Sequence, residues 1–461
     1  MNSLIVISIL ALIVLYLGLF KAKNALLPVS ILGLLGALVL AIMEWNSGAA
    51  PIFSGMMLFD NFAVAFSALT IISTILILLL SKSYFEKISE NVAEYYTIML
   101  FALVGVVVMV SYHNLSMLFV GLEIMSVSLY ILAGIKKRDF ASNEAALKYF
   151  LMGAFSTGFL LFGIALLYGA SNSFDLGVIA QYVIDRPTAE GIDPMFYVGI
   201  VLVMVGLSFK IGAAPFHFWT PDVYEGSPTL ITAFMSTVVK TAGFAAFLRL
   251  FATCFAPLAD FWMPTLLVIT ILTLFIGNIT ALYQSNFKRM LAYSSISHAG
   301  YMLFAIVALG STSINSVFVY AAAYSVASII AFAVLILVKE QTGGENFENF
   351  NGLGKKNPFL AFVLTVAMLS LAGIPLTAGF IGKFFMFSAA LEQYHTWLIV
   401  MAIINAIIGI FYYFKVIVAM YFKDAERKEL VSSGYYKLVI GASVIATVIL
   451  GVYPSLITDL F

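Results

Sequence analysis

Three lysines lie well inside long apolar runs of this sequence, at Lys210, Lys240 and Lys383. A charged side chain at the centre of a bilayer costs about 2.5–3.5 kcal/mol on insertion scales, and such residues usually mark an ion path. A desolvated lysine can release its proton near neutral pH, whereas an arginine stays protonated. We therefore predict that these three lysines transfer protons. A structural ion pair is the alternative.

Glu123 is the lone acidic residue deep in an apolar run, within GLEIMSVSLY. A single carboxylate among several buried lysines predicts an ion pair that favours the charged form of one lysine and releases its proton when broken. Lys148 is a further candidate for proton transfer. It follows Glu144 by four residues, so an ordinary ion pair on one helical face is an equally concrete interpretation.

Other ionisable residues carry weaker signals. His298, in YSSISHAGYM, is a secondary candidate because neighbouring hydroxyls could pass protons to it; a hydrogen-bonded core histidine is as good an interpretation. Arg249 and Lys415 lie in the outer thirds of their runs and are predicted to be structural. No histidine pair has a spacing that indicates metal or haem ligation, and the single cysteine, Cys254, cannot hold an iron–sulfur cluster. We expect no cofactor or metal in this chain.

The elements that position these residues are predicted to be membrane helices. Of the 461 residues, 62% are hydrophobic and only 10% are charged, whereas soluble domains are about 45–50% apolar and 25% charged. The sequence therefore predicts an all-α polytopic membrane protein embedded in a lipid bilayer. A formal net charge of +0 excludes a basic nucleic-acid-binding protein.

A window of about 19 residues finds fourteen apolar spans. Their ranges are 4–20, 25–43, 61–81, 96–112, 115–135, 145–169, 195–214, 229–253, 264–283, 290–309, 313–338, 359–390, 397–421 and 438–456. Connections on one side carry sixteen lysines and arginines, whereas the other side, with both termini, holds only Arg186. The positive-inside rule therefore predicts that both termini face outward.

The seventh and twelfth spans contain helix breakers. The run FKIGAAPFHFWTPDVYEGSPT includes Lys210 and then three prolines, and SLAGIPLTAGFIGKF ends just after Lys383. Irregular backbone at membrane depth is tolerated only where it is buried in protein or lines a water-filled cavity. The two breaks are five spans apart, and an odd offset reverses direction, so spans 4–8 and 9–13 are predicted to be inverted repeats. Kinks without function are the alternative.

Five motifs together carry a family resemblance: GLEIMSVSLYIL, EAALKYFLMGAFSTGFLLFG, FKIGAAPFHFWTPDVYEGSPT, NFKRMLAYSSISHAGYM and SLAGIPLTAGFIGKF. They resemble subunit N of the proton-pumping NADH:quinone oxidoreductases, respiratory complex I. The resemblance implies an antiporter-like fold of fourteen helices, with two inverted five-helix repeats broken at helices 7 and 12. It divides one membrane domain, 1–461, into three leading helices (1–95), two repeats (96–253 and 264–422) and a final helix (438–461).

The resemblance also implies roles for individual residues. By motif position, the family's ion-pair glutamate falls on Glu123, its partner lysine on Lys210 and the central lysine on Lys240. A further conducting lysine falls on Lys383, and a lysine of the sixth helix falls on Lys148. These residues would carry protons, and no residue would bind a cofactor or a metal.

The same resemblance implies partners and a location. FMN, iron–sulfur clusters and quinone would bind in partner subunits. The partners would be other membrane-arm subunits of complex I, including antiporter-like neighbours and the small subunits near the quinone module. The location would be the bacterial cytoplasmic membrane. Two rivals stay open: a subunit of a multisubunit sodium/proton antiporter without redox coupling, and a structural spacer in which the lysines conduct nothing.

Overall fold

The chain folds almost entirely into helices, in a computed structural model that describes residues 1–48, 50–88, 91–186, 191–310, 312–392, 396–425, 429–458 and 460. Two of the sixteen lysines and arginines assigned to the connections on one side, Arg427 and Lys428, lie outside the described residues. The chain divides into two compact units. Unit 1 comprises 1–75, 85–219 and 238–268, and unit 2 comprises 76–84, 220–237 and 269–461.

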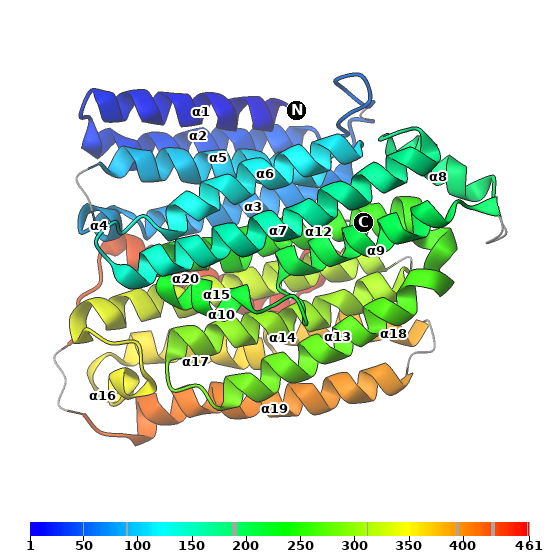
Figure 1. Ribbon diagram of the computed structural model, residues 1–461. Helices are drawn as coiled ribbons and strands as arrows, with labels where there is room; N and C mark the ends of the chain where they lie inside the picture. The colour runs from blue at the N-terminus through cyan, green and yellow to red at the C-terminus, as the bar shows by residue number, and fades with distance from the viewer. Residues whose placement is uncertain are drawn as a thin grey trace. The chain divides into compact units, whose positions relative to one another are not determined.

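Unit 1 holds the first half of the helices. They are α1 (Asn2–Leu19), α2 (Lys23–Met43), most of α3 (Asn61–Leu79), α5 (Val92–Ser111), α6 (Leu115–Ala133), α7 (Phe140–Ser171), α8 (Leu176–Ile184), α9 (Pro194–Ile211), α12 (Lys240–Leu250), η3 (Phe251–Phe255), η4 (Ala256–Leu258) and the start of α13 (Ala259–Leu282). Helices α1, α2 and α5 run side by side (Figure 1).

Glycines bring two helix pairs of unit 1 into close contact. A Cβ added at Gly163 of α7 would lie 2.9 Å from the carbonyl oxygen of Gly199 in α9, and the reverse distance is 3.0 Å. Gly105 and Gly121 bring α5 and α6 together in the same way, because a Cβ added at Gly105 would lie 2.7 Å from the carbonyl oxygen of Gly121. Small residues let membrane helices approach closely where no hydrophobic effect drives them together.

Unit 2 holds the remaining helices. They are α11 (Thr229–Phe234), the end of α13, α14 (Phe287–Ala308), α15 (Ser313–Thr342), η5 (Phe347–Phe350), α16 (Leu353–Lys356), α17 (Pro358–Ala372), α18 (Ala378–Glu392), α19 (Thr396–Phe422), α20 (Gly434–Val452) and α21 (Ser455–Thr458). The unit boundaries cut α4 (Lys82–Glu86), α10 (Trp219–Gly226) and the π-helical segment η2 (Met235–Val239). Helices α14 and α15 form the core, because nearly all their residues are buried.

All fourteen predicted spans coincide with helical segments. Among the described residues, twelve helical stretches are long and apolar enough to cross a membrane. One of them, Thr229–Leu282, contains two predicted spans, and the shorter apolar helices α17 and α18 together form the predicted twelfth. The prediction of an all-α membrane protein is confirmed.

Both predicted interruptions are present. Helix α9 ends at Ile211, followed by Gly212 with a φ of 74°, and regular helix resumes only at Trp219. Helix α17 ends at Ala372, followed by Gly373 with a φ of 84°, and α18 starts at Ala378. A left-handed residue ends a helix most easily where it is glycine. A further irregularity, the π-helical η2, was not predicted from the sequence.

Candidate functional site: two clusters of buried basic side chains

Lys210 lies in the last turn of α9 and its side chain points into the core of unit 1, since the residue is only 6% exposed. The ammonium nitrogen donates to Ser126 Oγ at 2.8 Å, from α6, and to the Tyr149 hydroxyl at 3.5 Å, from α7. Beside it is a small cavity of about 10 Å³, which has room for roughly one water molecule. Lys210 thus has hydroxyl partners that can exchange protons.

Glu123 lies three residues before Ser126 on the same face of α6. Its charge interacts with that of Lys210, but the Lys210 ammonium donates to Ser126 instead of to the carboxylate. In the described part of the chain, Glu123 Oε1 is buried without a hydrogen-bond partner. A buried carboxylate oxygen without a donor is costly, which favours a second arrangement in which a proton or a donor reaches it.

Lys240 is the first residue of α12 and is 3% exposed. It directly follows the π-helical η2, a distortion that is often found at functional sites. Gly243, one turn later on the same face, packs on the end of α9. A Cβ there would lie 2.9 Å from Ile211 and 4.0 Å from Lys210 Cγ. The face of α12 that carries Lys240 is therefore turned towards the end of α9 where Lys210 lies.

Lys383 of α18 lies in unit 2 at the broken end of α17. Its ammonium donates to the carbonyl oxygens of Ala372 at 2.8 Å and Leu371 at 3.3 Å. These are among the last carbonyls of α17, where the helix dipole is negative. The nitrogen also lies 4.8 Å from the centre of the Tyr301 ring. The helix break supplies the acceptors that hold this lysine.

His298 of α14 bridges two tyrosines in unit 2. Its Nδ1 lies 2.7 Å from the Tyr320 hydroxyl and its Nε2 lies 2.9 Å from the Tyr413 hydroxyl, which in turn lies 2.5 Å from Ser294 Oγ. Tyr320 also packs beside Gly382, the residue before Lys383, because a Cβ at that glycine would lie 3.1 Å from its ring. His298 is thus hydrogen-bonded at both nitrogens, next to the helix that carries Lys383.

The remaining ionisable residues of the spans have nearby partners. Lys148 pairs with Glu144 at 2.8 Å, and their side chains are 41% and 45% exposed. Arg249 pairs with Asp60 at 2.6 Å, and Lys415 donates to the Leu282 carbonyl at 2.6 Å. An exposed pair such as Lys148–Glu144 stabilises a fold by about 0–1 kcal/mol, whereas the Arg249 side chain is only 7% exposed. These geometries agree with the predicted structural roles of Arg249 and Lys415 and with the ion-pair interpretation of Lys148.

A buried ion cluster in unit 2 was missed by sequence reasoning. Lys288, which the charge count assigned to a connection, is the second residue of α14 and is fully buried. It donates to the carbonyls of Glu225 at 3.0 Å and Ser227 at 2.5 Å. Glu345 lies 3.9 Å from Lys288 and 2.5 Å from Lys339. The hydropathy pattern gave no signal here, because these residues lie at helix ends.

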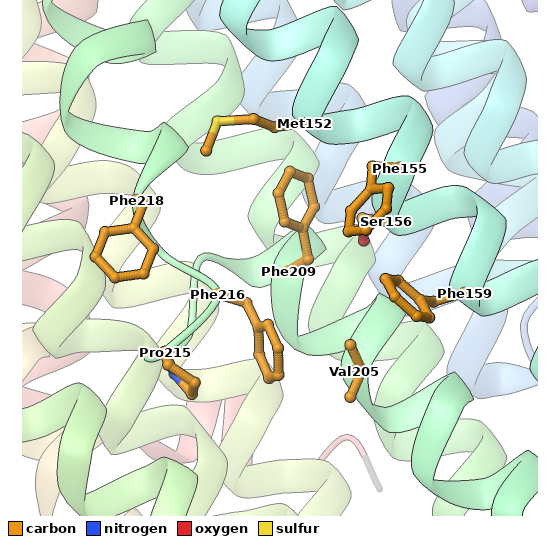
Figure 2. Close-up of a pocket in the computed structure, with 9 residues that line it drawn as sticks. All are labelled: Met152, Phe155, Ser156, Phe159, Val205, Phe209, Pro215, Phe216 and Phe218. Atoms are coloured by element: carbon orange, nitrogen blue, oxygen red, sulfur yellow. The ribbon is translucent and has the colours of Figure 1, made fainter.

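An apolar pocket of about 360 Å³ lies where α7 and α9 meet the segment 215–218, next to the small cavity beside Lys210. Figure 2 shows the side chains that surround it, which are Met152, Phe155, Ser156, Phe159, Val205, Phe209, Pro215, Phe216 and Phe218. Ser156 and Phe209 also line the small cavity beside Lys210. The pocket offers hydrocarbon contacts and one hydroxyl. Among the residues that the structure describes, no group of three His, Cys, Asp or Glu side chains could hold a metal ion.

Comparison with known proteins gives this arrangement a family. Residues 111–409 match the family described as NADH:quinone oxidoreductase/Mrp antiporter, TM. The NADH-quinone oxidoreductase subunit N of Cytophaga hutchinsonii is 41% identical, over 100% of this chain and 99% of that protein. The chain belongs to the subunit N family of NADH-quinone oxidoreductases. Subunit N lies in the antiporter-like membrane arm of complex I, so other membrane-arm subunits are its partners.

Solved structures agree with this assignment. A chain of respiratory complex I from Thermus thermophilus with bound Aureothin is 32% identical, with a TM-score of 0.85 over 99% of this chain and 98% of that one. A chain of the Mrp complex from Dietzia sp. DQ12-45-1b is 18% identical, with a TM-score of 0.89 over 99% of this chain and 95% of that one. The second likeness shows that the antiporter-like fold is shared and says nothing of activity. The family resemblance of the five motifs is confirmed.

Proposed function

We propose that this subunit N is a proton-translocating module of its respiratory complex. The observation that carries the proposal is that buried lysines lie at both helix breaks. Lys210 is held by hydroxyls at the end of α9, and Lys383 by carbonyls at the end of α17. Both lysines can therefore lose and regain a proton without leaving a hydrogen-bonding environment. Protons would be taken up from the cytoplasm, pass Lys210, Lys240 and Lys383 in order, and leave on the outer side.

Glu123 and Lys210 would form the switch of this module. Since Glu123 and Ser126 share a face of α6, the ammonium that now donates to Ser126 can turn to the carboxylate through a change of side-chain rotamer. The direct ion pair would favour protonated Lys210, and its rupture would release the proton to the hydroxyl cluster. Neighbouring subunits would bias the two arrangements. Lys148 would be an accessory charge next to Tyr149, which contacts Lys210.

The redox chemistry would belong to partner subunits. In this proposal, FMN and the iron–sulfur clusters are held elsewhere in the complex, as is the quinone site, and this chain has no redox centre. Antiporter-like neighbours and the small subunits near the quinone module would be its direct partners. The complex would lie in the bacterial cytoplasmic membrane with both termini of this chain on the outer side.

The experiment that tests the proposal is NADH-driven proton pumping in membrane vesicles that contain the assembled complex with Lys240→Ala. A matched control is Lys415→Ala, because Lys415 is also a lysine of a predicted span but donates to the carbonyl at the end of a neighbouring helix. We expect coupled turnover and pumping to be lost in Lys240→Ala and kept in the control. Normal pumping by the Lys240 variant would refute the relay and favour a structural spacer.

The matching family is described as NADH:quinone oxidoreductase/Mrp antiporter, which supports a second candidate, a sodium/proton antiporter subunit without redox coupling. Both candidates use the same fold and the same buried lysines. The purified membrane assembly separates them. Flavin and iron–sulfur absorbance that co-purifies with this chain supports the respiratory complex, and sodium-dependent proton exchange without these cofactors supports the antiporter.

A further inference from the structure

A charged cluster lies where α10 meets the start of α14 in unit 2. Arg289 pairs with Asp222 at 3.1 Å and with Glu225 at 2.5 Å, and the three side chains are 30%, 37% and 36% exposed. By the positive-inside count, this end of α14 faces the cytoplasm. Water therefore reaches these carboxylates from the side on which protons are taken up.

A set of linked hydroxyl groups starts at the residue next to Glu225 in the sequence. Tyr224, the residue before Glu225, is buried and hydrogen-bonds Ser295 of α14. Ser295 also hydrogen-bonds Tyr324 of α15. The Tyr324 hydroxyl lies 2.5 Å from Ser236 Oγ. Each of these groups can donate and accept a hydrogen bond, so a proton can pass along them as one O–H bond forms and the next breaks.

The last of these linked hydroxyl groups, that of Tyr324, belongs to a residue next to His298. The rings of Tyr324 and His298 lie 4.9 Å apart, centre to centre. Both residues, together with Tyr320 and Ser370, line a small cavity of about 10 Å³. One water is about the amount that such a space holds. A single water there would connect Tyr324 to the hydrogen-bonded pair of His298 and Tyr320.

The positions of Ser295 and His298 along α14 lie progressively farther from the charged cluster. Ser295 comes six residues after Arg289, and His298 comes nine residues after it. At a rise of about 1.5 Å per residue, these positions lie roughly 9 Å and 13 Å along the helix axis from the charged cluster. Ser295 and His298 thus lie at successive depths between the level of the exposed carboxylates and the interior of unit 2.

We propose that Tyr224, Ser295 and Tyr324 conduct protons from the Asp222–Glu225–Arg289 cluster to His298, as a second uptake branch that feeds unit 2 directly. The inference rests on the proposed proton-pumping function and adds a route that does not pass through Lys210. A carboxylate of the cluster takes a proton from bulk water and releases it, through intervening water, to the Tyr224 hydroxyl, and each hydroxyl in turn accepts one proton and releases its own. The imidazole of His298 is the acceptor, and the linked hydroxyl groups are restored by the reverse rotation of their O–H bonds.

The test is the rate of NADH-driven proton uptake by vesicles that contain the assembled complex with Tyr324→Phe or Tyr224→Phe. These changes remove one hydroxyl and keep the ring. The matched control is Tyr436→Phe, because the Tyr436 hydroxyl is buried in unit 2 and has no hydrogen-bond partner in the described part of the chain. We expect the rate to fall roughly twofold in each conducting variant, because the route through Lys210 stays intact. That is less than the 10²–10⁴-fold typical of a positioned proton donor, since water can fill the space left.

The solvent isotope effect on proton uptake separates conduction from structure. If the branch conducts, the isotope effect changes in Tyr324→Phe and stays at the wild-type value in Tyr436→Phe. Rates and isotope effects equal to those of the control would refute the branch. Lys383→Met, measured in parallel, reports on the underlying function. If it abolishes pumping while Tyr324→Phe matches the control, only the uptake branch is wrong, and if neither change matters, the proton-pumping proposal fails as well.

Discussion

Gly373 gives the sharpest test of how the helix break positions Lys383. The glycine has a φ of 84°, and a Cβ added to it would lie 2.7 Å from Lys383 Cδ. Ordinary contact begins at 3.4 Å, so in Gly373→Ala the lysine stem must move by about 0.7 Å, the difference between the two distances, to reach ordinary contact. The bond to the Leu371 carbonyl is already 3.3 Å long and is therefore the first to break.

The expected magnitude follows from two separate effects. A non-glycine residue in the left-handed region costs about 1–2 kcal/mol, which lowers the free energy of unfolding. A lost hydrogen bond from a charged donor costs about 1.5–3 kcal/mol, and if all of this raised the barrier to proton transfer, pumping would slow roughly 10- to 100-fold. Assembly is expected to survive, because the first effect is local.

The assay is NADH-driven acidification of inverted vesicles, normalised to the amount of assembled complex. The control is Gly441→Ala in α20, where an added Cβ meets no atom within 4 Å. Because Gly373 is proposed to act through Lys383, Gly373→Ala should cause no further loss in a Lys383→Met background. Pumping equal to that of the control, or additive losses in the double variant, would refute the reasoning.

Two further predictions concern other contacts. Ser126→Ala removes the 2.8 Å acceptor of the Lys210 ammonium and should slow coupled pumping roughly tenfold. Ser128→Ala removes a hydroxyl that, among the described residues, is bonded within α6; it should not slow pumping, and equal rates in the two variants would contradict the role of Ser126. Burial raises the pKa of the Glu345 carboxyl, but the Lys288 and Lys339 charges and hydrogen bonds from Lys339 and Asn286 together hold it below its ordinary value of 4.5. The ionised carboxylate thus stabilises the fold above pH 4.5, and this contribution is lost as the pH falls through the lower folded pKa. Glu345→Gln should cost about 1–3 kcal/mol at pH 7, less than a fully buried pair because Lys339 is partly exposed. Its melting temperature should converge with that of the wild type well below pH 4.5, and a pH-independent difference would exclude this explanation.

The membrane helices and their breaks could be predicted because they depend on local properties. A span needs about 20 apolar residues, so hydropathy alone located segments such as α15, and the glycine and proline runs located the ends of α9 and α17. Lys210, Lys240 and Lys383 stood out for the same reason, since charge inside an apolar run is rare and costly. The five motifs then indicated the family. The amino-acid sequence by itself thus determined the fold class, the family and the buried lysines.

Only the tertiary structure decided what each lysine contacts. Ser126 is 84 residues from Lys210 in the chain, and Ser128 on the same helix looks equally suitable in the sequence. The direction in which a side chain points depends on how helices rotate against one another, and glycine contacts such as Gly163 with Gly199 set that packing. The carbonyl acceptors of Lys383 depend on backbone geometry at the break, because every residue carries a carbonyl and only those at a helix end are free to accept. The burial of Lys288 likewise requires three segments to meet, which no local pattern encodes.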